Sequence, residues 1–269
     1  MYIASSDAGM LWVPDDVWYS FYNSPYVGHR NGTAVDVYYS HSMLFPCEEG
    51  RVREIRKVKT PMHIPFNEDY LIIVEMRNAC LKILHVEPHV TVGEKLNRGD
   101  EVGILIPSGY FMPWSDKHAH IEFRRCEDAR RARGGMPLRP IYNAKIPGTT
   151  DGEFVVVEKK EHYYWIKPLR AKFIGMSPVS NGKCSLEGGI PHYGMGAIIG
   201  GCTDFKFSGM RIEARNKNDS GVFLFNPNFT LYGNEKKIKG IGIFSNRNTI
   251  KMIGGDFEEG DTVLLKIKK

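Results

Sequence analysis

The segment "YLIIVEMRNACLKILHV" (residues 70–86) contains two short apolar runs separated by a polar stretch. Both runs are rich in β-branched and aromatic residues, which is typical of β-strands joined by a turn. The same pattern recurs in "TAVDVYY" (33–39), "EVGILI" (101–106) and "HIEFR" (120–124), and helical periodicity is scarce. The sequence therefore predicts an all-β fold built mainly from antiparallel sheet.

The composition is that of a globular protein with ample material for its cores. The chain has 269 residues, of which 42% are hydrophobic and 12% aromatic. Its net charge is +5, but acidic residues nearly match basic ones in number, so charge alone predicts no nucleic-acid partner. No apolar run is long enough to span a bilayer and no signal peptide is recognisable, so we expect a cytoplasmic protein, with export by a non-classical route as the alternative.

The cysteines are odd in number, lie far apart and never form a C-x-x-C pair. This distribution argues against a disulfide framework or a thiolate zinc site and predicts buried or free thiols. The five residues are Cys47, Cys80, Cys126, Cys184 and Cys202.

A second strand series follows a Pro- and Gly-rich stretch at about residues 136–152, which reads as a linker. Segments such as "FVVVEKK" (154–160) and "DTVLLKIKK" (261–269) are spaced as in a β-sandwich or β-barrel. We therefore predict one domain at 1–148 and a β-rich accessory domain of unknown role at 149–269.

Two histidines in "KHAHIEFR" (117–124) stand at alternate positions of a predicted strand. A strand rises about 3.3 Å per residue, so His118 and His120 share one face, roughly 7 Å apart. His85 and Asp36 lie on other predicted strands of the same domain. Any one of these residues is better explained as an ordinary core or surface residue, but imidazole and carboxylate are zinc ligands, and several together favour a metal site.

Residues 70–124 resemble the core of the lysostaphin and LytM-type zinc metallopeptidases, which have the duplicated hybrid motif fold. The family has a strand ending in His-Leu, then a hairpin region with spaced glycines, then His-x-His. This chain has "ILHV" with His85, then "VTVGEKLNRGDEVGIL" (90–105), then "HAHIEFR". Upstream, "GTAVDVYY" is similar to the family's Gly-x-Asp segment and contains Asp36. The resemblance spans roughly the first half of the chain.

The resemblance implies a role for each of these side chains. Asp36 and His120 would bind Zn²⁺, while His85 and His118 would be catalytic and face the substrate and the metal-bound water. One histidine would accept the proton of the water and the other would steady the oxyanion, and the two roles may be exchanged.

The first metal ligand departs from the family pattern. That ligand is a histidine four residues before the aspartate, where this chain has Gly32. The nearest candidate is His29, seven residues before Asp36. Since Asn31 and Gly32 favour a tight turn, a bulged loop could return His29 to the ion. The expected metal set is therefore His29, Asp36 and His120.

The implied activity is that of a zinc-dependent, endopeptidase-like hydrolase acting on a peptide or peptidoglycan-like substrate. Zinc would polarise the scissile carbonyl and lower the pKa of its bound water to about 7. The main alternative is a catalytically inactive metal-binding or scaffolding protein that retains the fold. A biotinyl or lipoyl carrier is disfavoured, because "VEMRNAC" (74–80) offers no lysine at the expected hairpin tip.

Overall fold

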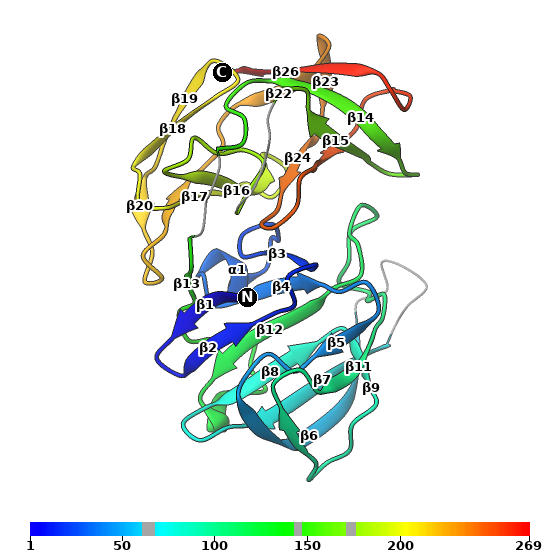
Figure 1. The fold of residues 1–269 in the computed structure, drawn as a ribbon, viewed down its shortest axis with the longest axis vertical. Helices are drawn as coiled ribbons and strands as arrows, with labels where there is room; N and C mark the ends of the chain where they lie inside the picture. The colour runs from blue at the N-terminus through cyan, green and yellow to red at the C-terminus, as the bar shows by residue number, and fades with distance from the viewer. Residues whose placement is uncertain (61–67, 143–146, 171–175) are drawn as a thin grey trace. The chain divides into compact units, whose positions relative to one another are not determined.

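The regular structure of the chain is almost entirely β-strand. The computed structural model describes residues 1–60, 68–142, 147–170 and 176–269 (Figure 1). Within these ranges the helical elements are the four-residue helix α1 (Val27–Arg30) and the 3-10 turn η1 (Cys126–Asp128). The all-β prediction is confirmed. The described residues include no helix that is long and apolar enough to cross a membrane.

Contacts divide the chain into two compact units. The first comprises Met1–Trp18 and Asn31–Ile141, and the second comprises Tyr19–Arg30 and Tyr142–Lys269. The sequence places a boundary after residue 148 and does not anticipate that an N-terminal segment groups with the C-terminal half. Part of the expected linker, residues 143–146, lies outside the described residues.

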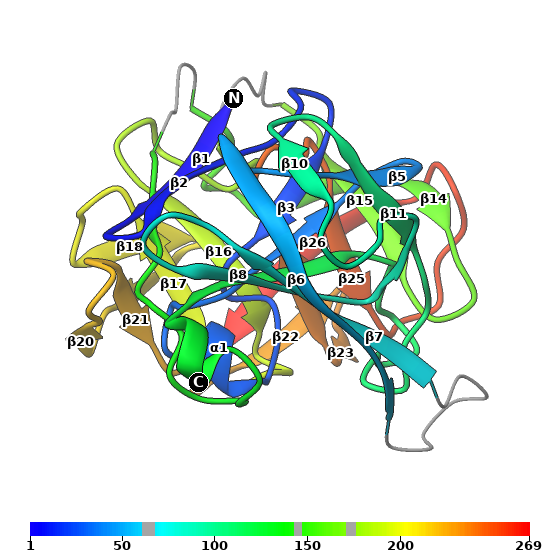
Figure 2. The ribbon, with the colours of Figure 1, turned by 90° about the horizontal axis from the view of Figure 1, so that it is seen from below.

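The main sheet of the first unit is antiparallel and has the strand order β10-β6-β7-β8-β12-β4-β3. Figure 2 shows the long strand β6 beside β7, with which it pairs over most of its length. The strands of this sheet are β10 (Lys95–Asn97), β6 (Glu49–Lys59), β7 (Glu68–Glu75), β8 (Cys80–Leu84), β12 (Ala119–Arg124), β4 (Val35–Tyr38) and β3 (Trp18–Ser20). The segment 70–86 forms the expected hairpin β7–β8, in which Leu71 pairs with Leu84.

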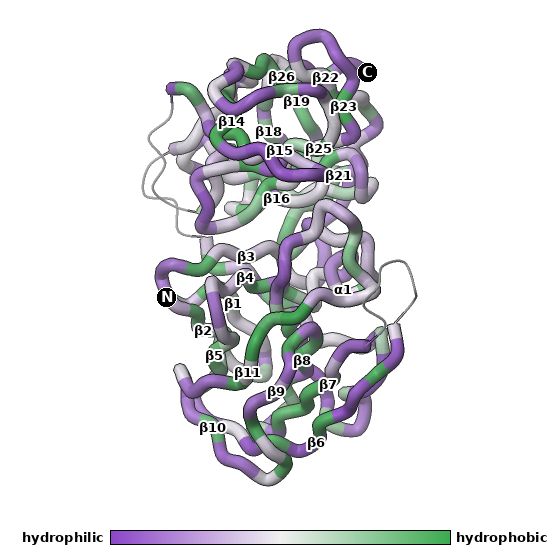
Figure 3. The backbone as a smooth tube through the Cα atoms, turned by 90° about the vertical axis from the view of Figure 1, so that its right-hand side faces the viewer, coloured by the Kyte–Doolittle hydropathy of each residue, from purple (hydrophilic) through white to green (hydrophobic). Residues whose placement is uncertain are grey.

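Two smaller antiparallel sheets complete the first unit. One has the order β5-β11-β9 and the other β13-β1-β2. Their strands are β5 (Ser42–Leu44), β11 (Glu101–Leu105), β9 (Val86–Pro88), β13 (Arg139–Pro140), β1 (Tyr2–Ser6) and β2 (Gly9–Trp12). The apolar runs of β7, β8 and β11 supply much of the core, as their hydrophobic colour in Figure 3 indicates. Burial of these alternating side chains fixes the register of the strands.

The second unit is built on one large antiparallel sheet with the order β20-β21-β17-β16-β24-β25-β15-β14-β26-β22-β23. Buried side chains from most of these strands form a single apolar cluster, so the sheet curves around its own core as a half-barrel. Its strands are β20 (Asn216–Lys217), β21 (Phe223–Phe225), β17 (Gly196–Ile199), β16 (Ser185–Ile190), β24 (Gly240–Ile243), β25 (Ile250–Ile253), β15 (Tyr164–Pro168), β14 (Glu153–Lys159), β26 (Thr262–Lys268), β22 (Thr230–Gly233) and β23 (Lys236–Ile238), and β18 (Asp204–Phe207) and β19 (Met210–Glu213) form a separate hairpin.

Four of the five cysteines form disulfides, so the prediction of free thiols was wrong for them. Cys80 is bonded to Cys126, with their Cα atoms 5.0 Å apart, and Cys184 to Cys202, with Cα atoms 6.1 Å apart. Sheet register explains the first pair. Cys80 lies opposite Arg124 at the end of β12, so the chain reaches Cys126 two residues later. Only Cys47, which is buried, is a free thiol.

Candidate metal centre

Strand register brings two of the expected metal ligands together. His120 lies in β12 directly opposite Asp36 in β4, and side chains at directly opposed positions of an antiparallel pair share a face. The His120 Nδ1 and Asp36 Oδ1 atoms are 2.9 Å apart. Both residues are buried, with exposed fractions of 8% and 3%.

The third expected ligand also reaches this point. His29 lies in α1, and Gly32, at φ +68°, allows the chain to turn between His29 and Asp36. The ligand atoms of His29, Asp36 and His120 all lie within 4.8 Å of one another. Among the residues that the structure describes, this is the group able to hold a metal ion.

The hydrogen bond of His29 determines which ring nitrogen is available to a metal. Its Nδ1 atom is 2.8 Å from the carbonyl oxygen of Phe21. A carbonyl can only accept, so Nδ1 carries the proton and Nε2 keeps the lone pair that a metal requires.

The donor set fits a zinc ion. Two imidazole nitrogens and one carboxylate oxygen make up the three protein ligands that a catalytic zinc site characteristically has. The other ring nitrogen of His120, Nε2, lies 3.1 Å from Oε1 of Glu122. A histidine that binds a metal through one nitrogen commonly donates its other N–H to a carboxylate, which orients the ring.

Both carboxylates affect the charge of His120. Burial lowers the pKa of His120, but the hydrogen bonds with Asp36 and Glu122 outweigh it and raise that pKa to about 9. Without a cation, the imidazole therefore holds an extra proton between two carboxylates. A metal at Nδ1 would replace that proton.

Glu122 belongs to a buried charge network that includes His120. Its Oε1 atom also accepts from Lys82 Nζ at 3.0 Å, and its Oε2 accepts from Arg124 at 2.8 Å. Burial raises the pKa of Glu122, but contacts with His120 and Lys82 hold it well below its usual range. The role of Glu122 was not predicted from the sequence, although strand alternation in "HIEFR" puts Glu122 on the face of His118 and His120.

His118 lies on the same face of β12. Its Nδ1 donates to the carbonyl of Asp116 at 2.8 Å, and its Nε2 is 3.4 Å from Oδ2 of Asp36. The ring stacks on Phe111, with centroids 4.4 Å apart. Burial is the main cause that lowers the pKa of His118 to about 4, although the charge of Asp36 opposes it. The imidazole is therefore neutral at neutral pH, with Nε2 as its basic atom.

His85 directly follows β8 and has an unusual backbone conformation. Its φ of +66° lies in the left-handed region, which is sparsely populated by residues other than glycine and is enriched at functional sites. Its ring centroid is 5.3 Å from that of His118 and 6.0 Å from that of His120. The two expected catalytic histidines and His120 thus form one cluster.

Asp69, at the start of β7, fixes the orientation of His85. Its Oδ2 atom accepts from His85 Nδ1 at 2.5 Å and from the Ser108 hydroxyl at 2.7 Å, while Oδ1 accepts the His85 backbone N–H at 2.9 Å. Burial raises the pKa of Asp69, but the hydrogen bond and charge of His85 lower it below its usual value. The carboxylate therefore stays ionised and holds the His85 ring in place.

Asp69 is a second residue whose role was not predicted from the sequence. Continued from Leu71–Leu84, the register of the β7–β8 hairpin puts Asp69 opposite Val86 and not opposite His85. His85 lies just beyond β8 and has a left-handed backbone, so strand register alone does not predict its contact with Asp69.

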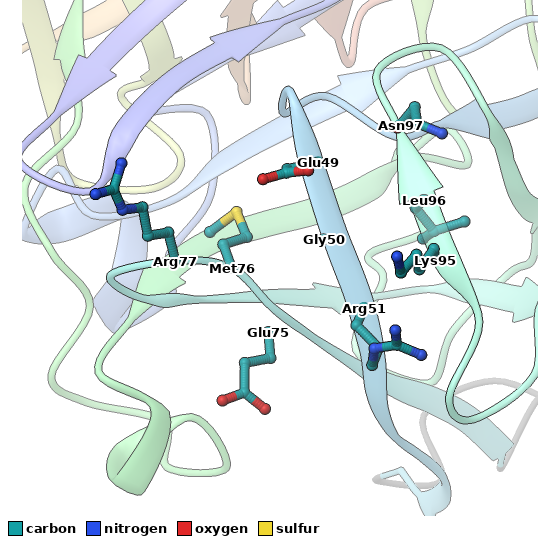
Figure 4. Close-up of a pocket in the computed structure, with 9 residues that line it drawn as sticks. All are labelled: Glu49, Gly50, Arg51, Glu75, Met76, Arg77, Lys95, Leu96 and Asn97. Atoms are coloured by element: carbon teal, nitrogen blue, oxygen red, sulfur yellow. The ribbon is translucent and has the colours of Figure 1, made fainter.

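A separate surface pocket lies at the turn end of the β7–β8 hairpin (Figure 4). Glu75 in this pocket is six residues from Asp69 along β7, or about 20 Å at the usual rise of a strand. The pocket is therefore distinct from the histidine cluster. It is lined by Glu49, Gly50, Arg51, Glu75, Met76, Arg77, Lys95, Leu96 and Asn97.

Comparison with known proteins assigns a family without an activity. No curated protein and no solved structure matches the chain. Residues 12–140 match the family model described as the N-terminal domain of DUF8155, a domain of unknown function, and residues 146–268 match the model of its C-terminal domain. With both domains present over most of its length, the chain belongs to the DUF8155 family.

Proposed function

We propose that this protein is a zinc-dependent peptide-bond hydrolase, endopeptidase-like, that acts on a peptide or peptidoglycan-like substrate. One observation carries the proposal: the ligand atoms of His29, Asp36 and His120 gather within 4.8 Å of one another. Two further histidines, His85 and His118, have their rings in contact beside this group, as hydrolysis by an activated water requires.

The hydrogen bonds of the two histidines favour different roles for them. His118 is neutral and its Nδ1–H is bound to a backbone carbonyl, so its Nε2 is suited to accept the proton of the attacking water. His85 is bonded through Nδ1 to the Asp69 carboxylate, which fixes the orientation of the ring that would steady the developing oxyanion. A bound zinc ion would supply Lewis acidity toward the scissile carbonyl and the water.

A catalytically inactive metal-binding or scaffolding protein is the second candidate. The observation that favours it is burial, since the five side chains of the cluster are between 1% and 8% exposed. A closed metal site is characteristic of structural zinc, whereas a hydrolase must admit the scissile bond.

The two disulfides bear on where such an activity would operate. Disulfides persist in oxidising surroundings and are rare in the reducing cytosol. The pairs Cys80–Cys126 and Cys184–Cys202 therefore favour a location outside the cytosol over the cytoplasmic location expected from the sequence. A peptidoglycan-like substrate would be accessible there.

The decisive experiment combines metal content with peptide cleavage. Zinc per chain is measured by native mass spectrometry in the wild type, in Asp36→Ala and in His120→Ala. His89→Ala serves as a matched control, because His89 is an exposed histidine of the same unit, bonded to Glu101. Cleavage of glycine-rich and wall-stem peptides is then followed in the wild type and in His118→Ala, with and without a chelator.

Each result selects one interpretation. One zinc per chain, lost in Asp36→Ala and His120→Ala but kept in His89→Ala, together with cleavage that His118→Ala abolishes, supports the hydrolase. Zinc without any cleavage supports the scaffold. A wild type that binds no zinc contradicts both.

A further inference from the structure

The expected metal ligand His29 lies in a segment that forms hydrogen bonds with residues far away in the sequence. We propose that Glu187, in β16, is a positioning residue that orients the His29 imidazole through the backbone of Phe21. This inference rests on the proposed zinc site. It gives a role to a buried carboxylate that lies outside the histidine cluster.

Glu187 is fully buried and accepts hydrogen bonds from the segment that precedes His29. Its Oε1 atom accepts the Ser20 hydroxyl at 2.7 Å, the backbone N–H of Phe21, and the backbone N–H of Tyr22 at 3.0 Å. Its Oε2 atom accepts the Ser245 hydroxyl at 3.1 Å. Three donors from consecutive residues therefore converge on one oxygen, which a carboxylate accommodates because its oxygens only accept.

Phe21 links this carboxylate to the metal ligand. The N–H of Phe21 donates to Glu187, and the carbonyl of the same residue accepts the Nδ1–H of His29 at 2.8 Å. Two hydrogen bonds through one buried residue thus join Glu187 to the imidazole. The second bond fixes the orientation of the His29 ring, so a displacement of Phe21 would move the nitrogen that is expected to bind the metal.

Neighbouring contacts hold the same segment without involving the Phe21 carbonyl. Tyr19 and Ser245 exchange backbone hydrogen bonds of 3.0 and 2.8 Å, and Asn218 donates to the Tyr22 hydroxyl at 2.9 Å. These contacts anchor the chain on either side of Phe21. These contacts remain when Glu187 is replaced. The effect of the Glu187 hydrogen bonds on His29 can therefore be measured separately.

This arrangement gives a physical reason for the shifted first ligand. His29 stands seven residues before Asp36, whereas the resemblance predicts a histidine four residues before it. Contacts other than this spacing must therefore position His29. Ordering a loop costs about 1–2 kcal/mol of conformational entropy per residue, so a ligand on a loop binds well only if other contacts order that loop first. The Glu187 hydrogen bonds supply this order before metal binds.

The test measures zinc affinity of the full-length protein by competition with a chromophoric chelator. Glu187→Gln keeps an oxygen that can accept from Phe21 and is expected to bind zinc within about threefold of wild type. Glu187→Leu fills a similar volume without an acceptor and is expected to lower the affinity by about 10- to 100-fold, as is usual when a residue that orients a metal ligand is lost. Ser177→Ala is the matched control, because it removes a buried hydroxyl that bonds the carbonyl of Leu186 next to Glu187.

A cycle with His29→Ala separates positioning from general destabilisation. In the His29→Ala background, Glu187→Leu should cause no further loss of affinity, because the ligand that it orients is absent. An equal loss in both backgrounds, or wild-type affinity in a folded Glu187→Leu, overturns the proposal. If Glu187→Leu does not fold, Ser20→Ala takes its place with an expected loss of about twofold to fivefold, and wild-type affinity there overturns the proposal equally.

The proposed function and this inference fail in different ways. A wild type without zinc overturns both of them. A wild type that binds zinc through Asp36 but is insensitive to Glu187→Leu overturns only the positioning role.

Discussion

The first unit buries ionisable side chains together, whereas the second buries a largely apolar core. Around β12, Asp36, Lys82, Glu122 and Arg124 are all less than 6% exposed and lie in one connected network with His120. Among the described residues of the second unit, the buried polar side chains are mostly serines, and the buried ionisable ones are His29, Glu187 and Lys251.

The difference shows that the cost of burying groups of ionisable side chains falls mainly on the first unit. Burial of a charge is costly unless partners compensate for it, and an apolar replacement is often as stable. A unit that nevertheless buries three histidines beside several charges has the features of a functional site. The second unit carries the expected ligand His29 but packs mainly around one large apolar cluster.

The largest expected effect is on the charge network of the first unit. Glu122→Ala leaves Lys82 and Arg124 buried without their carboxylate and should lower the free energy of unfolding by about 3–5 kcal/mol. Urea denaturation provides the measurement. Asp7→Ala, which breaks an exposed ion pair with Arg139, should leave the transition nearly unchanged. Equal losses of stability in the two variants would contradict the expected difference between buried and exposed charges.

The buried carboxylate of the second unit should make stability depend on pH. Burial, which outweighs the hydrogen bonds from Ser20 and the backbone, raises the pKa of Glu187 from 4.5 to about 7. The folded protein then binds more protons than the unfolded one between these values. Stability should therefore fall by about 3 kcal/mol as the pH rises from about 4.5 to 7, and level off above it.

Comparison of the wild type with Glu187→Gln isolates this contribution, because the amide does not titrate. Urea denaturation of both proteins at several pH values measures the difference. Parallel stability curves would show that Glu187 keeps an ordinary pKa in the folded protein.

A third prediction concerns the orientation of His85. Asp69→Asn removes the carboxylate that orients the His85 ring and should lower kcat by about 100-fold, equivalent to about 2.7 kcal/mol in the barrier. Zinc affinity should remain at the wild-type value, because Asp69 bonds to Tyr70, His85 and Ser108 and not to an expected metal ligand. Ser108→Ala should have a smaller effect of the same kind. Loss of zinc together with activity would instead make Asp69 part of the metal site.

The smallest expected effect comes from matched apolar truncations. Ile121→Val in the first unit and Ile198→Val in the second each remove one buried methyl group and should each cost about 1 kcal/mol of stability. Zinc affinity should not change in either variant. A change in Ile121→Val alone would mean that apolar packing of β12, in addition to its polar contacts, determines ligand geometry.

Local patterns were sufficient to predict the strands and several site residues. Short β-branched runs identified the hairpin at residues 70–86, and two-residue alternation put His118 and His120 on one face. The predicted strands also pointed to Asp36 and His85, and the resemblance added their expected roles and the candidate His29. Each of these inferences depends on spacing over a few residues or on a short motif, which a single sequence displays directly.

The missed features depend on contacts between distant parts of the chain. Glu187 acts on residues more than 160 positions away, and Cys126 meets Cys80 only through the pairing of β8 with β12. Hydrophobic periodicity carries no information on such pairings. Asp69 was missed as well, because the register of the β7–β8 hairpin, continued from Leu71–Leu84, puts Val86 and not His85 opposite it.

The left-handed backbone of His85 affects how any substitution at this position is to be read. With φ at +66°, alanine or a β-branched residue would add a backbone penalty to the loss of the ring. Asparagine tolerates that conformation well among non-glycine residues, so His85→Asn changes the side chain with the least disturbance of the main chain. A scan that uses alanine alone would therefore attribute conformational strain to chemistry, and the asparagine variant is the fair comparison.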